Sequence, residues 1–394
     1  MSETLIAPDW HVAHLFCHDV ARALPSEAVA LGEAVGRTLA DDVIALCEVP
    51  HYASSAMDGW AVAGSPPWRL VEAASLAAGE ATPIVTGGLV PVGTHGVLRS
   101  EHGALIGSDG RATLVPGADA GADEPRAGDN IRSIGEEVHL SDVVIRAGAV
   151  LNPAHIAVAA VCGHDRLAVL RRPRVGLILT GDEVVESGIP APGRVRDTFG
   201  PQLPALIGLL GGIVTARRRI GDDLQTSMSA ISDANTAANT DVVITTGGTS
   251  NSPVDHLHTA LAALDADILI DGITMRPGGP SLLARLVDGR FLIGLPGNPL
   301  AAMIGMLSVV RPLLAGLRGA AVPTLGSVLV GNELSSGRGR SRLIPYRLID
   351  GAAVQTQWLG SGMLRGLAEA DGVLVCPPTG AHSGDRLDTL PLPW

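Results

Sequence analysis

Residues 239–300 hold the three stretches that decide the fold: NTDVVITTGGTSNSPVDHLHTAL at 239–261, ITMRPGGP at 273–280 and FLIGLPGNPLAA at 291–302. Residues 241–246 predict a short buried strand, and this strand leads directly into the turn Gly247-Gly248, before a helix. Free backbone N–H groups in such a turn, together with the helix dipole, form a cradle for an anion. Asp255 would repel a phosphate there unless a divalent cation lay between them. The stretch therefore indicates a site for a phosphorylated ligand and a metal.

The segments around this stretch alternate between strand and helix patterns. Strands are expected at 174–180, 213–218, 241–246, 267–274 and 291–295, and helices at 201–210, 224–234, 254–264 and 299–317. Such alternation predicts a parallel, doubly wound α/β sheet whose sites lie at the carboxyl ends of the strands.

The remaining chain predicts further domains, since 394 residues exceed one ordinary domain. Residues 11–45 predict two helical segments, the second beginning at Ser26. Short β-type runs between Gly, Pro and Asp predict a β-rich domain over 46–140. A helix is expected at 150–162, and β-type patterns return from Pro323 onward.

Composition excludes several classes of protein. The net charge of −12 argues against general nucleic-acid binding. No uninterrupted apolar stretch of 18 residues appears, and no apolar run follows a basic start, so we expect a soluble cytoplasmic protein without a membrane segment. The four cysteines are scattered without a C-x-x-C pair, which indicates neither a disulfide framework nor a zinc site.

Asp58 and Glu183 each stand in a turn that allows two interpretations. Asp58 lies in SSAMDGWA (54–61), where a ligand could approach closely or where an Asp-Gly turn serves the chain alone. Glu183 lies in LTGDEV (179–184), where two adjacent acids suit metal coordination or base chemistry, or else cap a helix. The residues alone leave both alternatives open.

Two stiff loops and one basic segment are candidate oxyanion contacts. Arg276 begins RPGGP (276–280), which with GLPGNP (294–299) could hold backbone N–H groups rigidly or simply reverse the chain. Arg340 lies in GRGRSR (337–342), a cluster that could bind an oxyanion or form a solvated loop. Ser361 in LGSGM is a further candidate. Two histidine groups are weaker candidates for a metal site: His11, His14, His18 with Cys17, and His256 and His258 beside Asp255.

Taken together, these stretches resemble the MoeA/gephyrin-E family, the molybdopterin molybdenumtransferases. The similar segments follow the family's order along nearly the whole chain: SSAMDGWAV, GDNIRSIGEEV, LTGDEV, DVVITTGGTSNSPVD, GLPGNP and GSGMLRGLAEADGVLVCPP. The resemblance implies four parts: an extended helical region (1–45 plus 140–170), a β-rich domain (46–139), a MogA/MoaB-like α/β domain (171–320) and a C-terminal β-barrel-like domain (321–394).

The resemblance also implies an activity and partners. The implied reaction inserts molybdate into adenylylated molybdopterin and releases AMP, with a divalent cation such as Mg²⁺. A homodimer is implied, in which the N-terminal part of one subunit completes a cleft on the other. MogA/MoaB-like proteins or molybdoenzymes are implied as further partners.

Site residues follow from the family by matching position. The acidic residues implied in catalysis are Asp58, Glu183 and Asp255, and those implied in metal binding are Asp223, Asp255 and Glu183. The residues implied to hold the cofactor and the oxyanion are Gly247, Gly248, Ser250, Arg276, Pro277, Gly297, Asn298, Arg340 and Ser361.

Two departures from the family pattern keep a second function open. Gly279 stands where the family usually has the second Lys of K-P-G-K-P, and Ala301 stands where it often has Ser. Losing such contacts favours a non-catalytic molybdopterin-binding or scaffold paralogue with weakened molybdate binding. A third hypothesis, an unrelated nucleotide-binding α/β enzyme that uses the Gly247-Gly248 turn, does not explain the motifs outside 174–320.

Overall fold

The computed structural model describes residues 4–107, 112–238, 240–249 and 256–394. The chain divides into two compact units. The first unit comprises Met1–Glu27, Gly36–Thr38 and Val169–Trp394, and the second comprises Ala28–Val35 and Leu39–Ala168. The chain passes from the first unit to the second within β2 (Ser26–Ala30) and passes back within β13 (Arg166–Leu170), apart from the short segment Gly36–Thr38.

A seven-stranded mixed sheet forms the centre of the first unit. Its order is β1 (Leu5–Ile6), β19 (Asp267–Asp271), β21 (Leu282–Arg285), β22 (Phe291–Leu295), β18 (Val242–Thr246), β14 (Arg174–Leu179) and β17 (Ile213–Arg219). The last four are parallel, and only β21 runs against its neighbours on both sides. The apolar run from Val242 to Ile244 is buried, as expected for strands covered on both faces.

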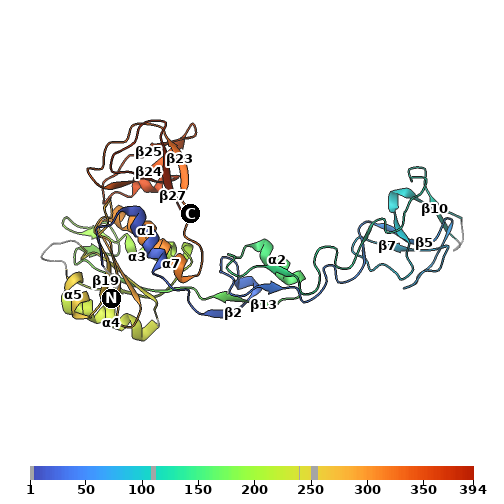
Figure 1. Ribbon diagram of the computed structural model, residues 1–394, viewed down its shortest axis with the longest axis horizontal. Helices are drawn as coiled ribbons and strands as arrows, with labels where there is room; N and C mark the ends of the chain where they lie inside the picture. The colour runs from blue at the N-terminus through green and yellow to red at the C-terminus, as the bar shows by residue number, and fades with distance from the viewer. Residues whose placement is uncertain (1–3, 108–111, 239, 250–255) are drawn as a thin grey trace. The chain divides into compact units, whose positions relative to one another are not determined.

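Helices cover both faces of this sheet (Figure 1). One face packs against α1 (Trp10–Asp19), α3 (Phe199–Leu209), α6 (Pro299–Gly305), a π-helical segment at Met306–Val310 and α7 (Arg311–Leu317). The other face packs against α4 (Leu224–Ala238) and α5 (Leu257–Ala263). The stretch Pro299–Leu317 is long and apolar enough to cross a membrane, but 94% of its apolar window is buried, as in a core helix.

A closed barrel of five strands completes the first unit. It joins β24 (Ser341–Ile349), β25 (Ala352–Gln355), β23 (Gly326–Val330), β27 (Arg386–Pro391) and β26 (Gly372–Cys376), and β26 pairs back onto β24. The short strand β20 (Met275–Arg276) adds to β24 in parallel. Helix α8 (Arg365–Ala368) lies between β25 and β26 in the sequence.

The second unit is built mainly from short strands. Its largest sheet has the order β8 (Gly96–Arg99), β5 (Gly59–Ala63), β7 (Glu80–Ile84), β6 (Trp68–Leu70), β10 (Thr113–Pro116) and β9 (Gly103–Ile106). Two small sheets pair β3 (Val43–Ile44) with β12 (Val143–Ile145) and β4 (Ser54–Ser55) with β11 (Ile131–Arg132). Helix α2 (Pro153–Val161) begins with Asn152 as its capping residue.

The predicted fold class is confirmed, with an α/β domain, a β-rich part and a C-terminal barrel. One segment was predicted wrongly: the helix expected from Ser26 is strand β2 followed by a 3-10 turn at Leu31–Glu33. Strand β2 pairs with β13, and this pairing outweighs the helical propensity of its residues. The four domain boundaries stay predictions.

Candidate functional site

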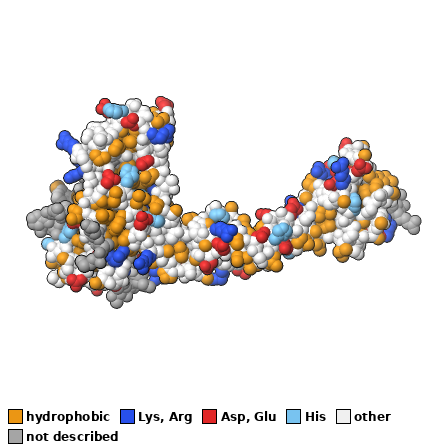
Figure 2. All heavy atoms as spheres, in the orientation of Figure 1, with side chains coloured by type: hydrophobic (Ala, Val, Ile, Leu, Met, Phe, Trp, Pro, Cys, Tyr) orange, Lys and Arg blue, Asp and Glu red, His pale blue; other side chains and the backbone are white. Residues whose placement is uncertain are grey.

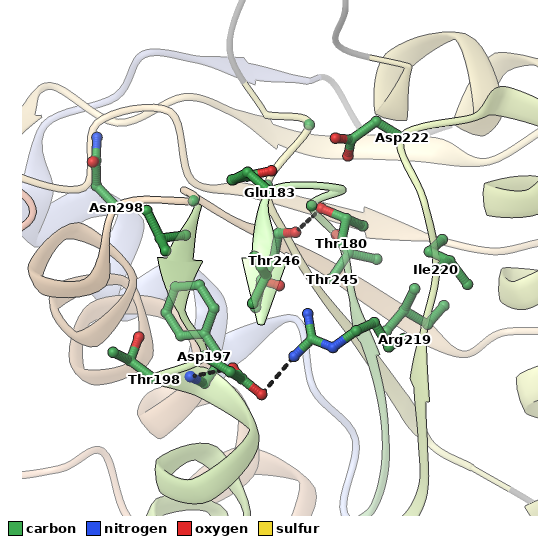
Figure 3. Close-up of a pocket in the computed structure, with 18 of the residues that line it drawn as sticks. Thr180, Glu183, Asp197, Thr198, Arg219, Ile220, Asp222, Thr245, Thr246 and Asn298 are labelled. Atoms are coloured by element: carbon green, nitrogen blue, oxygen red, sulfur yellow. Dashed lines mark hydrogen bonds and ion pairs between the residues drawn. The ribbon is translucent and has the colours of Figure 1, made fainter. Parts of the chain in front are cut away.

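A cavity of about 630 Å³ opens at the carboxyl edge of β14 and β18, where a doubly wound sheet is expected to bind its ligand (Figure 3). The turn Gly247-Gly248 and the loop Gly297-Asn298 line it, as does Glu183. Further polar residues that line it are Thr180, Arg196, Asp197, Thr198, Arg219, Asp222, Ser227, Thr245, Thr246 and His256. The predicted glycine turn, Glu183 and Asn298 are therefore brought together.

The glycine turn needs glycine for two physical reasons. Gly247 and Gly248 have φ angles of +85° and +70°, which side chains rarely adopt. A Cβ atom at Gly247 would also lie 2.6 Å from Oγ1 of Thr180. The turn therefore presents its backbone to the cavity without side chains. The N–H of Gly247 donates to the backbone O of Leu295 at 2.8 Å, so the N–H of Gly248 is the candidate contact for an anion. Ser250, predicted to hold the cofactor, and Asp255, predicted to act in catalysis and metal binding, lie outside the described residues.

The acidic residues beside the turn divide into two kinds. Glu183 and Asp222 line the cavity, and both are exposed. Asp223 instead caps α4, where its carboxylate accepts a hydrogen bond from the backbone N of Thr226 at 2.7 Å. This bond from Thr226 holds the pKa of Asp223 below its ordinary value. Asp223 is therefore occupied with the helix, and its neighbour Asp222 is the carboxylate that reaches the cavity.

The cavity wall also contains a tight ion pair. Nη2 of Arg219 lies 2.5 Å from Oδ2 of Asp197, and Figure 3 shows the two side chains pointing toward each other. The second carboxylate oxygen of Asp197 accepts from the backbone N atoms of Phe199 and Gly200, both at 3.0 Å, at the start of α3. One carboxylate thus fixes both the arginine and the helix that border the cavity.

A second cavity of about 240 Å³ gathers the predicted oxyanion residues. Its wall includes Arg276, Pro277, Arg340 and Ser361. Asn298 lines both cavities, so the two lie side by side. Strand β20 pairs with β24, and Arg276 lies opposite Arg342 in this pair. The pairing therefore places Arg276 beside the loop that contains Arg340. Part of the predicted site thus forms the first cavity and part forms the second.

Gly279 and Ala301, which depart from the family pattern, both line this second cavity. A Cβ atom at Gly279 would lie 2.9 Å from the backbone O of Met275, closer than such atoms normally approach. A lysine could enter position 279 only with a shift of the backbone. Ala301 is buried, and its backbone N donates to the O of Ser361 at 3.1 Å.

Asp58 belongs to the second unit, whereas Glu183 belongs to the first. Its Oδ1 accepts from the backbone N of Thr86 at 2.6 Å and from Oγ1 of Thr86 at 2.9 Å. These two bonds lower the pKa of the exposed Asp58 carboxyl. A Cβ atom at Gly59 would lie 2.0 Å from the backbone O of Leu98, so the Asp-Gly turn requires its glycine. Asp58 therefore remains a proposed catalytic residue with a fixed, ionised side chain.

The histidine groups do not form a metal centre in the described part of the chain. There, no group of three or more His, Cys, Asp or Glu side chains is placed to hold a metal ion. Nδ1 of His14 lies 3.0 Å from the backbone O of Ser308, and burial lowers its pKa to about 4. Burial raises the pKa of the Cys17 thiol. Nε2 of His258 lies 2.9 Å from Oδ1 of Asp271.

Several cavity residues were missed from the sequence: Thr180, Asp197, Arg219, Asp222, Thr245 and Thr246. The sequence did contain a signal for Asp222, which lies three residues after the end of β17, in the region where ligand contacts are expected. Asp197 offered a signal too, because an acidic residue stands there just before a helix.

Three family descriptions match the chain in sequence order. "MoeA N-terminal region (domain I and II)" matches residues 11–163, "Probable molybdopterin binding domain" matches 176–316, and "MoeA C-terminal region (domain IV)" matches 328–392.

Curated relatives and solved structures agree with these matches. The molybdopterin molybdenumtransferase of Staphylococcus aureus (strain COL) is 31% identical over 322 residues, covering 76% of this chain and 73% of the relative. That of Staphylococcus epidermidis (strain ATCC 12228) is 27% identical, covering 92% and 90%. The molybdopterin biosynthesis MoeA protein of Pyrococcus horikoshii OT3 has the same fold, with a TM-score of 0.75, 24% identity and coverage of 98% and 100%. The chain therefore belongs to the MoeA family of molybdopterin molybdenumtransferases.

Proposed function

We propose that this chain inserts molybdate into adenylylated molybdopterin and releases AMP, in a reaction that depends on Mg²⁺. The observation that carries the proposal is the pair of adjoining cavities that share Asn298. The larger cavity offers an anion cradle and two carboxylates for a pyrophosphate with its cation. The smaller cavity offers two arginines for an oxyanion.

The smaller cavity suits molybdate. Arg276 and Arg340 both line it, and in the described part of the chain neither side chain forms an ion pair. Their guanidinium groups can therefore donate forked hydrogen bonds to a tetrahedral oxyanion, and Ser361 can add a hydroxyl donor. Gly279 contributes no charge, so the two arginines supply most of the attraction.

The larger cavity suits a pyrophosphate with a divalent cation. Mg²⁺ commonly uses one or two protein carboxylates together with phosphate oxygens and waters, and Glu183 and Asp222 provide two carboxylates at the cavity. The donor set therefore fits the cation even though the described residues hold no complete metal centre. Bound there, Mg²⁺ would neutralise charge on the pyrophosphate and favour its cleavage. The backbone N–H of Gly248 would hold the same phosphates in place, because that of Gly247 already donates to the backbone O of Leu295 at 2.8 Å.

An AMP-release assay tests this function. Purified protein is mixed with adenylylated molybdopterin, and AMP is measured by chromatography with and without Mg²⁺ and molybdate. We expect AMP only when both are present. AMP no higher than in a control without protein would contradict the proposal.

The molybdate site can be tested separately by direct binding. Arg276→Ala and Arg340→Ala should each weaken molybdate binding by roughly ten- to a hundredfold, because each removes a charged contact worth about 1.5–3 kcal/mol. Arg338→Ala is the matched control, since Arg338 lies in the same loop but does not line the cavity. Equal effects of Arg338→Ala and Arg340→Ala would contradict the site.

A non-catalytic scaffold remains the second proposed function, because Gly279 and Ala301 remove family contacts. If this function is correct, the chain binds adenylylated molybdopterin without turnover, and Gly279→Lys should raise molybdate binding. Gly279→Ala is the necessary control, since any side chain at this position presses on the backbone O of Met275. An inactive protein in which Gly279→Lys and Gly279→Ala bind molybdate equally would exclude this explanation.

We also propose that two copies of the chain form a homodimer in the cytoplasm. The second unit exposes a group of apolar side chains on neighbouring segments, and apolar atoms reach its surface in Figure 2. The group consists of Ile44, Leu46, Val143 and Val161, with Ile44 opposite Val143 in the β3–β12 pair. Exposed apolar clusters of this kind often mark protein interfaces. Light scattering at micromolar concentration should give the mass of two chains, and the mass of one chain would contradict the dimer. MogA/MoaB-like proteins and molybdoenzymes remain proposed partners.

A further inference from the structure

The glycine turn begins where three parallel strands of the central sheet end together. Leu179 of β14, Thr246 of β18 and Leu295 of β22 are the last residues of their strands and lie opposite one another. Beyond Leu179 the chain soon leaves the extended conformation, since Gly181 has a φ angle of +121°. The first peptide group after β18, which joins Thr246 to Gly247, therefore needs partners other than the regular strand ladder.

This peptide group is held at both ends. The hydroxyl of Thr180 donates a hydrogen bond to the backbone O of Thr246 (Figure 3). The N–H of Gly247 donates to the backbone O of Leu295 at 2.8 Å. One bond comes from the β14 side and the other from the β22 side, so the planar peptide group cannot rotate without breaking one of them. The hydroxyl of Thr180 thus replaces the ladder bond that β14 no longer supplies.

The next peptide group, between Gly247 and Gly248, carries the N–H that is the candidate contact for an anion. In the described part of the chain, this N–H of Gly248 has no hydrogen-bond partner. Only the torsion angles of Gly247 separate it from the clamped peptide group. Because glycine adopts many such angles, a turn without the clamp could direct the N–H elsewhere. The clamp therefore sets the direction in which the N–H of Gly248 points.

Thr180 and Gly247 also fit each other closely in space. A Cβ atom at Gly247 would lie 2.6 Å from Oγ1 of Thr180, closer than such atoms approach. The hydroxyl of Thr180 thus occupies the space that a side chain at position 247 would need. Thr180 lines the cavity together with both glycines, so the clamp lies at the site itself.

We propose that Thr180 is a positioning residue, whose hydroxyl clamps the peptide group before the glycine turn and so holds the N–H of Gly248 toward the phosphate groups of the substrate. This inference rests on the proposed function, because it concerns the phosphate contact of that function. The hydroxyl has a single proton, which the carbonyl of Thr246 accepts, so Thr180 acts through the turn and not as a donor to the ligand. Loss of the hydroxyl should weaken any ligand whose pyrophosphate lies at this turn.

Calorimetry with Mg²⁺ and inorganic pyrophosphate tests the proposal without turnover. Thr180→Val keeps the branched shape but removes the hydroxyl, so it should weaken pyrophosphate binding about tenfold or more, the loss of one hydrogen bond to a charged group. Thr180→Ser keeps the hydroxyl and should bind within about threefold of the wild type. Thr389→Val is the control for stability alone, since the hydroxyl of this buried barrel residue bonds the backbone O of Val373 at 3.1 Å. It should bind pyrophosphate within about twofold of the wild type.

Kinetics with adenylylated molybdopterin separate the clamp from a loss of folded protein. Thr180→Val should raise KM about tenfold with little change in kcat, because the N–H of Gly248 holds the pyrophosphate both before and during the reaction. A fall in kcat at constant KM, which partial unfolding would cause, would count against the clamp.

The binding measurement decides between the outcomes. Equal pyrophosphate binding by the wild type and Thr180→Val, or equally weak binding by Thr180→Val and Thr180→Ser, would overturn the proposal. A wild-type protein that binds no pyrophosphate would overturn it as well. The expected order of affinities in a protein that releases no AMP would support the clamp and contradict the proposed reaction.

Discussion

Asp197→Ala should destabilise the first unit far more than removal of an ordinary surface acid. Asp197 makes two separate contributions, since one oxygen caps α3 and the other pairs with Arg219. Its side chain is 9% exposed and that of Arg219 is 23% exposed, so water cannot replace either contact fully. Glu186 also contacts Arg219, but its side chain is 70% exposed and cannot compensate for the loss.

The expected magnitude follows from these two contributions. Loss of the cap costs about 1 kcal/mol. Loss of a charged hydrogen bond that leaves a half-buried guanidinium costs about 1.5–3 kcal/mol. Asp197→Ala should therefore lower the free energy of unfolding by about 2.5–4 kcal/mol. Asp197→Asn keeps a capping oxygen and should cost about 1 kcal/mol less than Asp197→Ala.

Hydrogen–deuterium exchange of peptides from α3, recorded at increasing urea concentration, measures the free energy of unfolding of the first unit alone. The matched control is Asp233→Ala, because Asp233 pairs with the neighbouring Arg218 on the other face of the sheet and both side chains are more than half exposed. That control should cost at most about 1 kcal/mol. If Asp197→Ala and Asp233→Ala differ by less than about 0.5 kcal/mol, the assignment of a partly buried, doubly bonded carboxylate is wrong.

Three further predictions concern acids and a buried histidine. Asp222→Asn should slow Mg²⁺-dependent AMP release at least about tenfold. Asp223→Asn should change the rate by less than about threefold, because asparagine still caps α4. AMP release at several Mg²⁺ concentrations measures both effects, and a larger effect of Asp223→Asn would indicate that Asp223 is the metal ligand. Burial lowers the pKa of His14 to about 4, so its stabilising effect is complete above about pH 6.5 and is lost as the pH falls toward 4. Urea unfolding at pH 7 and pH 4.5 should therefore show a smaller loss of stability in His14→Gln than in the wild type, and equal losses would show that folding does not lower the pKa of His14. Thr86→Val removes the hydroxyl bond to Asp58 but keeps the backbone bond, so it should raise the lowered pKa of Asp58 part of the way to its ordinary value; a carbon-13 NMR titration measures this, and an unchanged pKa would exclude the hydroxyl bond in solution.

Much of the α/β sheet could be predicted from the sequence because its strands are short, apolar and bounded by glycine. The strand at 291–295 and the helical stretch at 299–317 were predicted with their observed bounds. The antiparallel strand β21 was missed, since Leu282–Arg285 is only four residues long and its position depends on pairing with β22. Ser26–Ala30 became a strand for the same reason. Local propensity is weak evidence where pairing with a distant strand decides the outcome.

The candidate site shows the same limit. The glycine turn was visible because positive φ angles restrict the residue type at Gly247 and Gly248. The sequence spacing of Arg276 and Arg340 could not show that both line one cavity, because this depends on the pairing of β20 with β24. The difference between Asp222 and Asp223 depends on which of them begins α4, a detail of about one residue that sequence patterns do not fix.

The central claim is that the two cavities act as one site, in which molybdate bound at the arginines triggers release of AMP from the glycine turn. Single-turnover AMP release at increasing molybdate concentrations tests it most directly, in the wild type and in Arg340→Ala. We predict that release saturates with molybdate and that Arg340→Ala raises the half-saturating concentration at least about tenfold. AMP release that is independent of molybdate, or an identical molybdate dependence in the two proteins, would contradict the claim.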